Sequence, residues 1–214
     1  MSSRFAEGLA QLNLLLSDHI IQKELDFLDE LLRWNQRVNL TSIRNRDEAI
    51  EKHLLDSLLL LPHLGDAKKI IDIGSGGGLP GIPLAIADTN LKVLSIDSVG
   101  KKINFQKHIK RLLQLNNLTV MQSRIENLTQ TALEQEKYDL VLSRAFSSLD
   151  ISLRYAAPWL KPGGRLVAMK GPEGREELRA AEKMIKQKNF YDWEVIAYEL
   201  PFSSAERQLV ILKK

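Results

Sequence analysis

The chain contains the run Ile70-Ile71-Asp72-Ile73-Gly74-Ser75-Gly76-Gly77-Gly78-Leu79-Pro80-Gly81, in which an apolar segment passes through an acid into a turn with five glycines. An apolar helical pattern, residues 82–87, follows directly. This order predicts a strand, a tight loop and the start of a helix. Glycine permits positive φ and close approach of a ligand to the backbone, at an entropic cost. We therefore expect the glycine loop, residues 74–81, to contact a ligand.

Two acids narrow the identity of that ligand. Gly76, Gly78 and Gly81 satisfy the G-x-G-x-x-G pattern of dinucleotide sites, but such a match alone is weak. A carboxylate at Asp72 suits a ligand with an ammonium or sulfonium group better than it suits a diphosphate. Asp97 closes the next apolar run at roughly the 20-residue distance at which an acid takes ribose hydroxyls in such folds. S-adenosylmethionine, a cationic amino-acid nucleoside, fits both acids and is the predicted cofactor.

Composition sets outer bounds on fold and location. The 214 residues suffice for one large α/β core with a small extension, and 44% hydrophobic with 27% charged residues is ordinary for soluble globular proteins. The chain has no cysteine, which excludes disulfides and thiolate metal sites, and its four histidines lack metal-ligand spacing. Neither a signal peptide nor a long apolar stretch is visible. We expect a cytoplasmic protein that binds no metal and no membrane.

The net charge of +3 is unevenly distributed. Residues 1–66 hold 7 Lys/Arg against 11 Asp/Glu, whereas residues 67–214 hold 23 against 16. Basic surfaces attract phosphates, but an imbalance of this size is also common on solvated faces, so charge alone leaves nucleic-acid binding open. One expected helix carries the series Lys101, Lys102, Lys107, Lys110 and Arg111, for which a solvated face is favoured over an RNA groove.

The apolar periodicity predicts the order of helices and strands. Residues 4–64 read as helices, with Ser17 as an N-cap and with Pro62 ending a helix that starts near Asp47. Strands are expected near 69–73, 92–97, 118–122, 138–143 and 165–170, and helices near 80–88, 100–115, 148–160 and 174–188. Two further strands, near 193–200 and 207–213, have no helix between them. Such alternation predicts a doubly wound, mostly parallel sheet.

Five βα units followed by a hairpin are the α/β layout of the class I (Rossmann-like) methyltransferase fold, with seven strands. Dinucleotide oxidoreductases usually carry a sixth βα unit instead of the hairpin. We expect residues 1–66 to form an N-terminal helical extension and residues 67–214 the S-adenosylmethionine-binding domain, packed as one unit. Residues 34–41 break the helical pattern, and they form either a capped helix end or a loop facing the active site.

Open α/β sheets bind ligands at the carboxyl ends of their strands. This rule selects the glycine loop, Asp97 and the segments 123–126, 143–146 and 170–172. Each cation there also has an interpretation that involves no ligand. Arg124 could pair with Glu126 at the surface, Arg144 could brace a loop, and Lys170 could be a solvated strand end. Three cations converging on one rim are less expected by chance.

Several motifs occur together in order: His53-Leu-Leu-Asp-Ser57, the glycine loop with its Leu79-Pro80-Gly81 ending, Asp97-Ser-Val-Gly-Lys-Lys102, Gln122-Ser-Arg-Ile-Glu126, Ser143-Arg-Ala-Phe146, Lys170-Gly171 and Glu206-Arg207. With these motifs the chain, from Trp34-Asn35 to the last strand, closely resembles the glucose-inhibited division protein B family, the bacterial 16S ribosomal RNA (guanine-N7) methyltransferases. The resemblance implies methyl transfer from S-adenosylmethionine to N7 of one guanine near the decoding centre of the small ribosomal subunit.

The resemblance also implies roles for individual residues. The cofactor set comprises Asp72, Gly74, Gly76, Leu79, Asp97, Ile125, Glu126 and Arg144; within it, Gly74 and Leu79 would line the methionine end, Ile125 and Glu126 the adenine, and Arg144 the pocket edge. The set facing the RNA comprises Arg124, Lys170, Arg207, Asn39 and His53. The implied partner is 16S ribosomal RNA or the small subunit, bound by a monomer.

The chemistry of guanine N7 limits what the protein must supply. N7 carries an unprotonated lone pair, so its attack on a sulfonium methyl needs no general base. Consistent with this, the chain has no Asn/Asp-Pro-Pro-Tyr/Phe motif and no cysteine for attack on cytosine C5, and we assign no catalytic residue. An Arg bidentate to O6 and N7 would cover the nucleophile. Arg124, Lys170 and Arg207 are therefore predicted to hold phosphates, with at most a single contact to O6.

Three other functions remain open from the residues alone. A nicotinamide-dependent oxidoreductase would share the glycine loop and Asp97, but it would not explain Asp72 or the terminal hairpin. An RNA-binding assembly factor without catalysis would not need a cofactor site. A methyltransferase acting on a small molecule or a protein is separated from an RNA enzyme only by the family resemblance.

Overall fold

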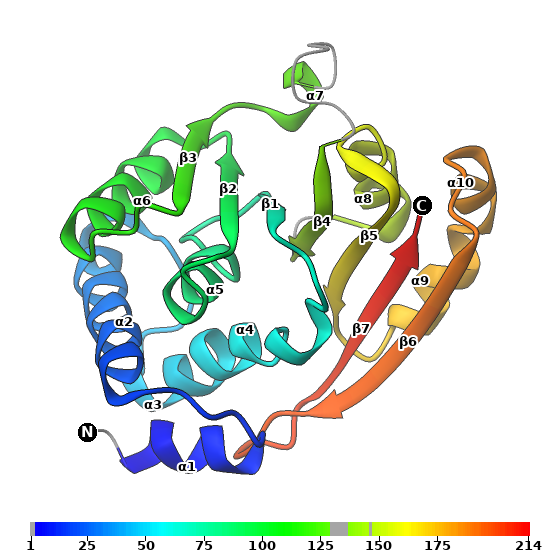
Figure 1. Cartoon of the computed structure of the whole chain (residues 1–214). Helices are drawn as coiled ribbons and strands as arrows, with labels where there is room; N and C mark the ends of the chain where they lie inside the picture. Colours follow the sequence, from blue (N-terminus) through cyan, green and yellow to red (C-terminus); the bar gives the residue numbers. More distant parts are fainter. Residues whose placement is uncertain (1–2, 129–136, 146) are drawn as a thin grey trace.

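A seven-stranded sheet forms the centre of the computed structural model, which describes residues 3–128, 137–145 and 147–214 (Figure 1). The strands are β1 (Lys69–Ile73), β2 (Lys92–Asp97), β3 (Leu118–Gln122), β4 (Tyr138–Arg144), β5 (Leu160–Lys170), β6 (Asp192–Glu199) and β7 (Glu206–Lys213). Their order is β3-β2-β1-β4-β5-β7-β6. Strands β1 to β5 are parallel, and β7 pairs antiparallel with β5 and β6. The predicted doubly wound sheet with a terminal hairpin is confirmed.

The direction of winding reverses between β1 and β4. From β1 the chain proceeds outward through β2 to β3, and it then returns to β4 on the other side of β1. In open parallel sheets such a reversal leaves a crevice beyond the carboxyl ends of the central strands. The glycine loop follows β1 at this position. The fold thus places the predicted ligand loop at the edge of the sheet where ligands bind.

Helices cover both faces of the sheet (Figure 1). Ile70 of β1 belongs to one hydrophobic cluster with α5, α6 and the N-terminal helices, whereas Ile71 and Ile73 belong to a second cluster with α8 to α10. The helices are α1 (Ser3–Gln11), α2 (Asp18–Val38), α3 (Arg46–Ala49), the π-helix η1 (Ile50–Leu55), α4 (Asp56–Leu58), the 3-10 helix η2 (Leu61–His63), α5 (Gly81–Ala87), α6 (Gly100–Leu112), α7 (Ile125–Leu128), α8 (Leu149–Ala156), α9 (Gly174–Ala180) and α10 (Glu182–Gln187).

The N-terminal helices share a hydrophobic core with the sheet. Phe5 in α1 and Leu28 in α2 are fully buried in the same cluster as Ile70 of β1 and Leu209 of β7. A Cβ at Gly77 of the glycine loop would lie 3.0 Å from a methyl group of Leu31 in α2, so this helix supports the loop from behind. No helix of the described residues combines the length and apolar character that crossing a membrane requires.

The end of α2 differs from the expectation that the helix breaks near Trp34. The helix continues to Val38, because Asn35 provides a cap from inside its last turn: its Oδ1 accepts from the N–H groups of Leu40 and Thr41 at 2.7 and 2.9 Å. Asn39, at the C-cap, takes φ = 46°. The capped helix end is therefore confirmed, and the same capping directs Leu40 against the glycine loop, 3.9 Å from a Cβ at Gly77.

Three other boundaries also differ. The predicted Ser17 cap is confirmed at 3.4 Å from Ile20 N, but Pro62 does not end a helix, since it lies in the first turn of η2, where its missing N–H has no partner to lose. Strand β5 starts at Leu160, five residues before the expected start near 165, because Leu160 already pairs with Tyr138 across a register shift. The helix expected over 174–188 is divided into α9 and α10 at Ala181.

Candidate functional site

The glycine loop is tied to the end of β2 through Asp97. Gly76, at φ = 58°, donates its N–H to Asp97 Oδ2 at 2.9 Å, and Val99 N donates to Asp97 Oδ1 at 2.8 Å. Positive φ favours glycine at position 76, and a Cβ there would meet only Lys102 Nζ, at 4.0 Å. The carboxylate is 7% exposed, so it is held in place by two amides while one edge stays open.

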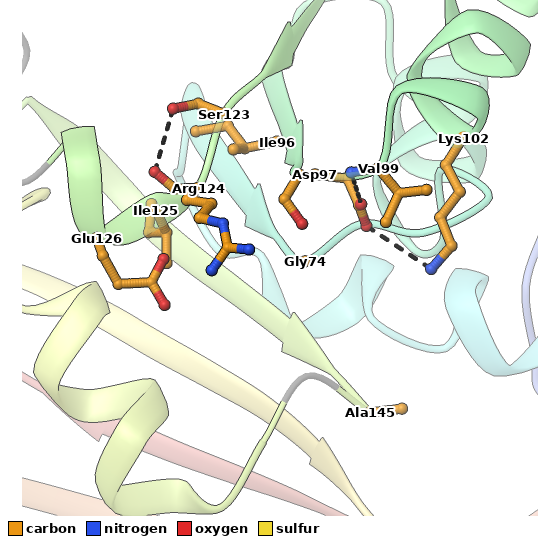
Figure 2. Close-up of a pocket in the computed structure, with 11 residues that line it drawn as sticks. Gly74, Ile96, Asp97, Val99, Lys102, Ser123, Arg124, Ile125, Glu126 and Ala145 are labelled. Carbon is orange, nitrogen blue, oxygen red and sulfur yellow. Dashed lines mark hydrogen bonds and ion pairs between the residues drawn. The ribbon is translucent and has the colours of Figure 1, made fainter.

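A pocket of about 330 Å³ opens beside this carboxylate, at the carboxyl ends of β1 to β3 (Figure 2). It is lined by Gly74, Ile96, Asp97, Ser98, Val99, Lys102, Ser123, Arg124, Ile125, Glu126 and Ala145. We call it the nucleoside pocket. It brings together four predicted cofactor residues, Gly74, Asp97, Ile125 and Glu126. Arg124, which was expected on the RNA side, also lies on its wall.

The lining of the nucleoside pocket fits S-adenosylmethionine. Asp97 offers an acceptor for ribose hydroxyls, since a carboxylate can accept more bonds than the two amide bonds it already makes. Ile125, 4% exposed, and Ile96 give apolar surface of the kind an adenine packs against. Gly74, at φ = 67°, brings the backbone of the glycine loop to the wall of the pocket.

Lys102, like Arg124, lines the nucleoside pocket although the sequence placed it elsewhere. It was grouped with the solvated face of α6, yet its ammonium group lies 4.0 Å from Asp97 Oδ2 and its side chain is 29% exposed (Figure 2). The signal was available in the sequence, because a helix that starts at Gly100 directs its first turn back toward the end of the preceding strand. Ser98 and Val99 adjoin Asp97 in the chain and were missed for lack of any chemical signal.

Asp72 does not face the nucleoside pocket, contrary to the expectation that it meets the ligand. Its side chain is fully buried, and Oδ2 accepts from Gly81 N at 2.9 Å at the start of α5. A Cβ at Gly81 would lie 2.8 Å from this oxygen, which explains the need for glycine there. Oδ1 has no hydrogen-bond partner among the described residues, and burial raises the pKa of Asp72 to about 7. Leu79 is likewise a core residue and lines neither pocket of this region.

A second pocket, of about 510 Å³, adjoins the first at Ala145. It is lined by Ile43, Lys52, His53, Asp56, Arg144, Ala145, Ser147, Met169, Lys170, Gly171, Glu177 and Arg207. We call it the substrate pocket. It unites His53, Lys170 and Arg207 of the predicted RNA set, which come from η1, β5 and β7. Asn39 lines neither pocket, and Phe146, part of the motif after β4, lies outside the described residues.

Arg144 lines the substrate pocket, next to Ala145, which borders both pockets, and its predicted role at the edge of the cofactor site stays a prediction. Its Nη1 donates to Lys52 O and to Asp56 Oδ2, each at 3.2 Å, and its Nη2 lies 3.3 Å from His53 Nδ1. Asp56 Oδ1 in turn accepts from Tyr198 Oη at 2.9 Å. Burial, followed by the neighbouring guanidinium, lowers the pKa of His53 to about 4, so its ring is neutral at pH 7. These contacts join the N-terminal helices to β4 and β6.

Lys170 is not a solvated rim cation. Its side chain is 10% exposed, and Nζ donates to Ser147 O and to Glu177 Oε2, both at 2.7 Å. Those two contacts leave little of the ammonium group for a phosphate. Arg124 is exposed and Arg207 half-buried, so these two residues remain the cations of the predicted rim. Among the described residues, no cluster of three His, Cys, Asp or Glu could hold a metal ion.

Comparisons with known proteins agree with this geometry. The family model described as "rRNA small subunit methyltransferase G" (GidB) matches residues 20–210. The Ribosomal RNA small subunit methyltransferase G of Syntrophotalea carbinolica is 44% identical over 214 residues, covering 100% of this chain and 98% of the relative. That of Aromatoleum aromaticum is 43% identical over 212 residues, covering 97% and 96%.

Solved structures resemble the fold at low identity. An O-methyltransferase from Bacillus cereus in complex with SAH aligns with a TM-score of 0.64 and 16% identity over 88% of this chain and 91% of that one. A putative O-methyltransferase from Klebsiella pneumoniae aligns with a TM-score of 0.62 and 16% identity over 87% and 89%. These likenesses support the class I methyltransferase fold.

Proposed function

The chain belongs to the GidB family, described as rRNA small subunit methyltransferase G, and on this premise we propose that it transfers a methyl group from S-adenosylmethionine to N7 of one guanine in 16S ribosomal RNA. The observation that carries the proposal is the pair of pockets that meet at Ala145. One offers a carboxylate and apolar surface for a nucleoside. The other is lined by cations and lies where a base could reach the methyl group.

The residues of the nucleoside pocket divide the cofactor between them. Asp97 would take the ribose hydroxyls, Ile125 and Glu126 the adenine, and Gly74 the methionine end. S-adenosylmethionine supplies a methyl group on a cationic sulfur. The protein's own task is to bind this group, to exclude water and to align the acceptor, which is where a catalyst of this kind gains its rate.

No residue needs to take a proton. Guanine N7 is an acceptor with a free lone pair, so the reaction adds a methyl group and leaves a cationic base. The neutral His53 and the fully bonded Asp56 in the substrate pocket are consistent with that requirement, because neither has to act as a base. A nicotinamide-dependent oxidoreductase is set aside by the family and by the terminal hairpin.

The RNA is held outside the two pockets. Arg124 and Arg207 are the cations that face solvent near the pocket mouths, and we assign them to phosphates. Lys170 leaves this set because its ammonium group is already bonded. The proposal includes a monomer that acts in the cytoplasm, where its substrate is found, without a metal ion.

The deciding experiment is methyl transfer from labelled S-adenosylmethionine to small ribosomal subunits from cells that lack the enzyme. Strand scission at N7-methylguanine then maps the product. We expect one labelled guanine near the decoding centre. Tight cofactor binding without label in RNA would leave the fold and the cofactor in place and would redirect the search to small molecules and proteins.

A further inference from the structure

Glu177 is an acid in the substrate pocket to which neither the sequence motifs nor the proposed function gives a role. It lies in α9, which packs beside β7 and α8 (Figure 1), and its side chain is 31% exposed. One other acid, Asp56, is among the residues that line this pocket, and both of its oxygens are bonded, to Arg144 and to Tyr198. Glu177 is therefore the acid of the pocket that is open to a ligand.

The carboxylate of Glu177 is fixed on one side and free on the other. Oε2 accepts from Leu149 N at 2.8 Å and from Lys170 Nζ at 2.7 Å. Lys170 is itself anchored by Ser147 O at 2.7 Å. Oε1 has no hydrogen-bond partner among the described residues. The ammonium group of Lys170 thus holds one oxygen of Glu177 and leaves the other oxygen for a donor in the pocket.

When a guanine presents N7 to the cofactor, its hydrogen-bond donors face away from the cofactor. O6 and N7 are acceptors on one edge, whereas N1–H and the N2 amino group are donors on the opposite edge. Enzymes that modify a base insert it into a pocket and read that second edge. Since Ala145 borders the nucleoside pocket and Glu177 belongs only to the substrate pocket, a base spanning the substrate pocket can satisfy both ends.

We propose that Oε1 of Glu177 reads the target base, accepting from N1–H and N2–H of guanine while N7 faces the cofactor. This role rests on the proposed function. It selects against adenine, which has an acceptor at N1 and no amino group at C2, so that acceptor would face acceptor. A buried acceptor left without its donor discriminates strongly between substrates.

The same contact assists the transfer. The N7 lone pair forms the bond to the methyl carbon while the bond from sulfur to that carbon breaks, and its electron pair stays on sulfur. No proton leaves the base, so the purine gains one positive charge and the sulfur loses one. A carboxylate bonded to N1–H and N2–H stabilises the charge that develops on the ring. Lys170 moderates this attraction and lets the cationic product depart.

Inosine tests the contact directly, because it keeps N7, O6 and N1–H but lacks the N2 amino group. Subunits reconstituted with inosine at the target position should be methylated by the unaltered enzyme with kcat/KM about 10- to 100-fold lower than guanine subunits. In Glu177→Gln the amide oxygen can keep the bonds to Leu149 and Lys170, which turns an NH2 group into the pocket. The ratio of kcat/KM for guanine subunits to kcat/KM for inosine subunits should then fall to within about threefold of one.

This ratio separates reading from folding, since structural damage lowers both rates together. Glu176→Gln, an exposed neighbour on the same helix, is the matched control and should keep the full ratio. Affinities of a short guanine or inosine RNA, measured without cofactor, should show the same loss of preference in Glu177→Gln. A variant with the original ratio would overturn the role of Glu177. Failure of the unaltered enzyme to methylate guanine subunits would instead overturn the proposed function.

Discussion

Asp72 and Asp97 end neighbouring strands, yet their carboxylates occupy different surroundings. Asp97 is held by two loop amides with one edge open to the nucleoside pocket. Asp72 shares the face of β1 that carries Ile70, so it points under the sheet edge toward α5. One acid is therefore placed to bind a ligand directly. The other fixes the helix that follows the glycine loop.

Substitution of Asp97 tests its part in cofactor binding. Asp97→Ala removes the acceptor for ribose hydroxyls and should weaken binding of S-adenosylmethionine by about 10- to 100-fold, as loss of hydrogen bonds to a charged group does. Isothermal calorimetry gives the dissociation constant, and circular dichroism checks the fold. Asp88→Ala, beyond the far end of α5, is the control and should bind normally. Unchanged affinity in Asp97→Ala would remove this residue from the site.

Titration of Asp72 should appear in the pH dependence of stability. Burial raises its pKa from 3.8 to about 7, so between these values the folded state holds a proton that the unfolded chain releases. The contribution of this group to the free energy of unfolding therefore falls as pH rises through that window and is constant above it. The free energy of unfolding of Asp72→Asn should therefore rise relative to that of the unaltered protein as pH increases through this window, by at most about 4 kcal/mol. Urea denaturation of both proteins at several pH values measures this difference in the free energy of unfolding. A difference that does not change with pH would contradict the prediction.

Arg124 should act on RNA through charge. If it holds one phosphate, Arg124→Ala lowers the affinity for the small subunit and reduces the slope of log affinity against log salt by about 0.7 to 0.9. Filter binding at a series of salt concentrations measures both. Arg111→Ala is the matched control, since Arg111 is an exposed cation in the last turn of α6, away from the pockets. An unchanged salt slope with lower turnover would reassign Arg124 to the chemistry of the nucleoside pocket.

The lining of the nucleoside pocket follows from the sequence more directly than the surroundings of the cations do. Residues next to a strand end, such as Ile125 and Glu126, follow directly from the topology. The partners of Lys170 and Arg144 do not follow in this way: Glu177 lies seven residues after Lys170, beyond the turn into α9, and Asp56 lies 88 residues before Arg144. Whether a cation meets a phosphate or a buried acid depends on packing between elements, which a single sequence does not display.

At the scale of elements, the turn between β6 and β7 is held by the N-terminal helices. Glu51 of η1 is buried, and its Oε1 accepts from Phe202 N, Ser203 N and Ser203 Oγ at 2.7 to 2.9 Å. Arg4 of α1 lies over the ring of Phe202, 4.0 Å from its centroid. The hairpin that completes the sheet thus depends on helices at the other end of the chain.

Removal of Glu51 should loosen that connection. Glu51→Ala leaves three donors without their acceptor and should lower the free energy of unfolding by about 2 to 4 kcal/mol in urea denaturation. Glu48→Ala, which breaks only a surface pair with Lys52, should cost less than about 1 kcal/mol. An equal effect of both substitutions would show that the buried acid contributes no more than a surface one.

The effect of Glu51→Ala on stability should also depend on pH. Burial alone would raise the pKa of Glu51, but the bonds from Ser203 and Phe202 outweigh it and lower the pKa. The ionised form therefore stabilises the folded state, fully so above the ordinary glutamate pKa, and this contribution is lost as pH falls through the lowered value. The destabilisation in Glu51→Ala should accordingly shrink below about pH 4.

Helices and strands were predicted best where the apolar pattern of the sequence continues without interruption. Strands β1 to β3 match their expected ranges because each is a mostly apolar run with a clear end, at Gly74 after β1 and at the polar residues Asp97 and Gln122 in β2 and β3. The end of α2 was misplaced, since the polar Asn35 lies inside the last turn of the helix and caps its end rather than breaking it. The split at Ala181 has no signal in the sequence, because the surrounding residues all favour helix.

At the scale of the whole molecule, the acidic N-terminal part and the basic remainder complement each other. Residues 1–66 carry 11 acids against 7 cations, and two of these acids, Glu51 and Asp56, are buried against β4, β6 and the hairpin turn. Part of the excess of acids in residues 1–66 is therefore buried inside the protein and does not lie on its surface. These acids contribute to the packing of the N-terminal helices against the sheet.

This continuity predicts that the chain unfolds as one cooperative unit, although its sequence divides near residue 66. One hydrophobic cluster runs from Phe5 through Leu28 to Leu209, so neither part can lose its structure without exposing the other. In a background that also carries Trp193→Phe, Trp159→Phe leaves the half-buried Trp34 of α2 as the fluorescent reporter, and Trp34→Phe leaves the buried Trp159 before β5. In each variant the urea midpoint by fluorescence should coincide with that by far-UV circular dichroism. An earlier fluorescence transition confined to the variant that keeps Trp34 would show that the helices unfold separately, and the extension would then be a domain of its own.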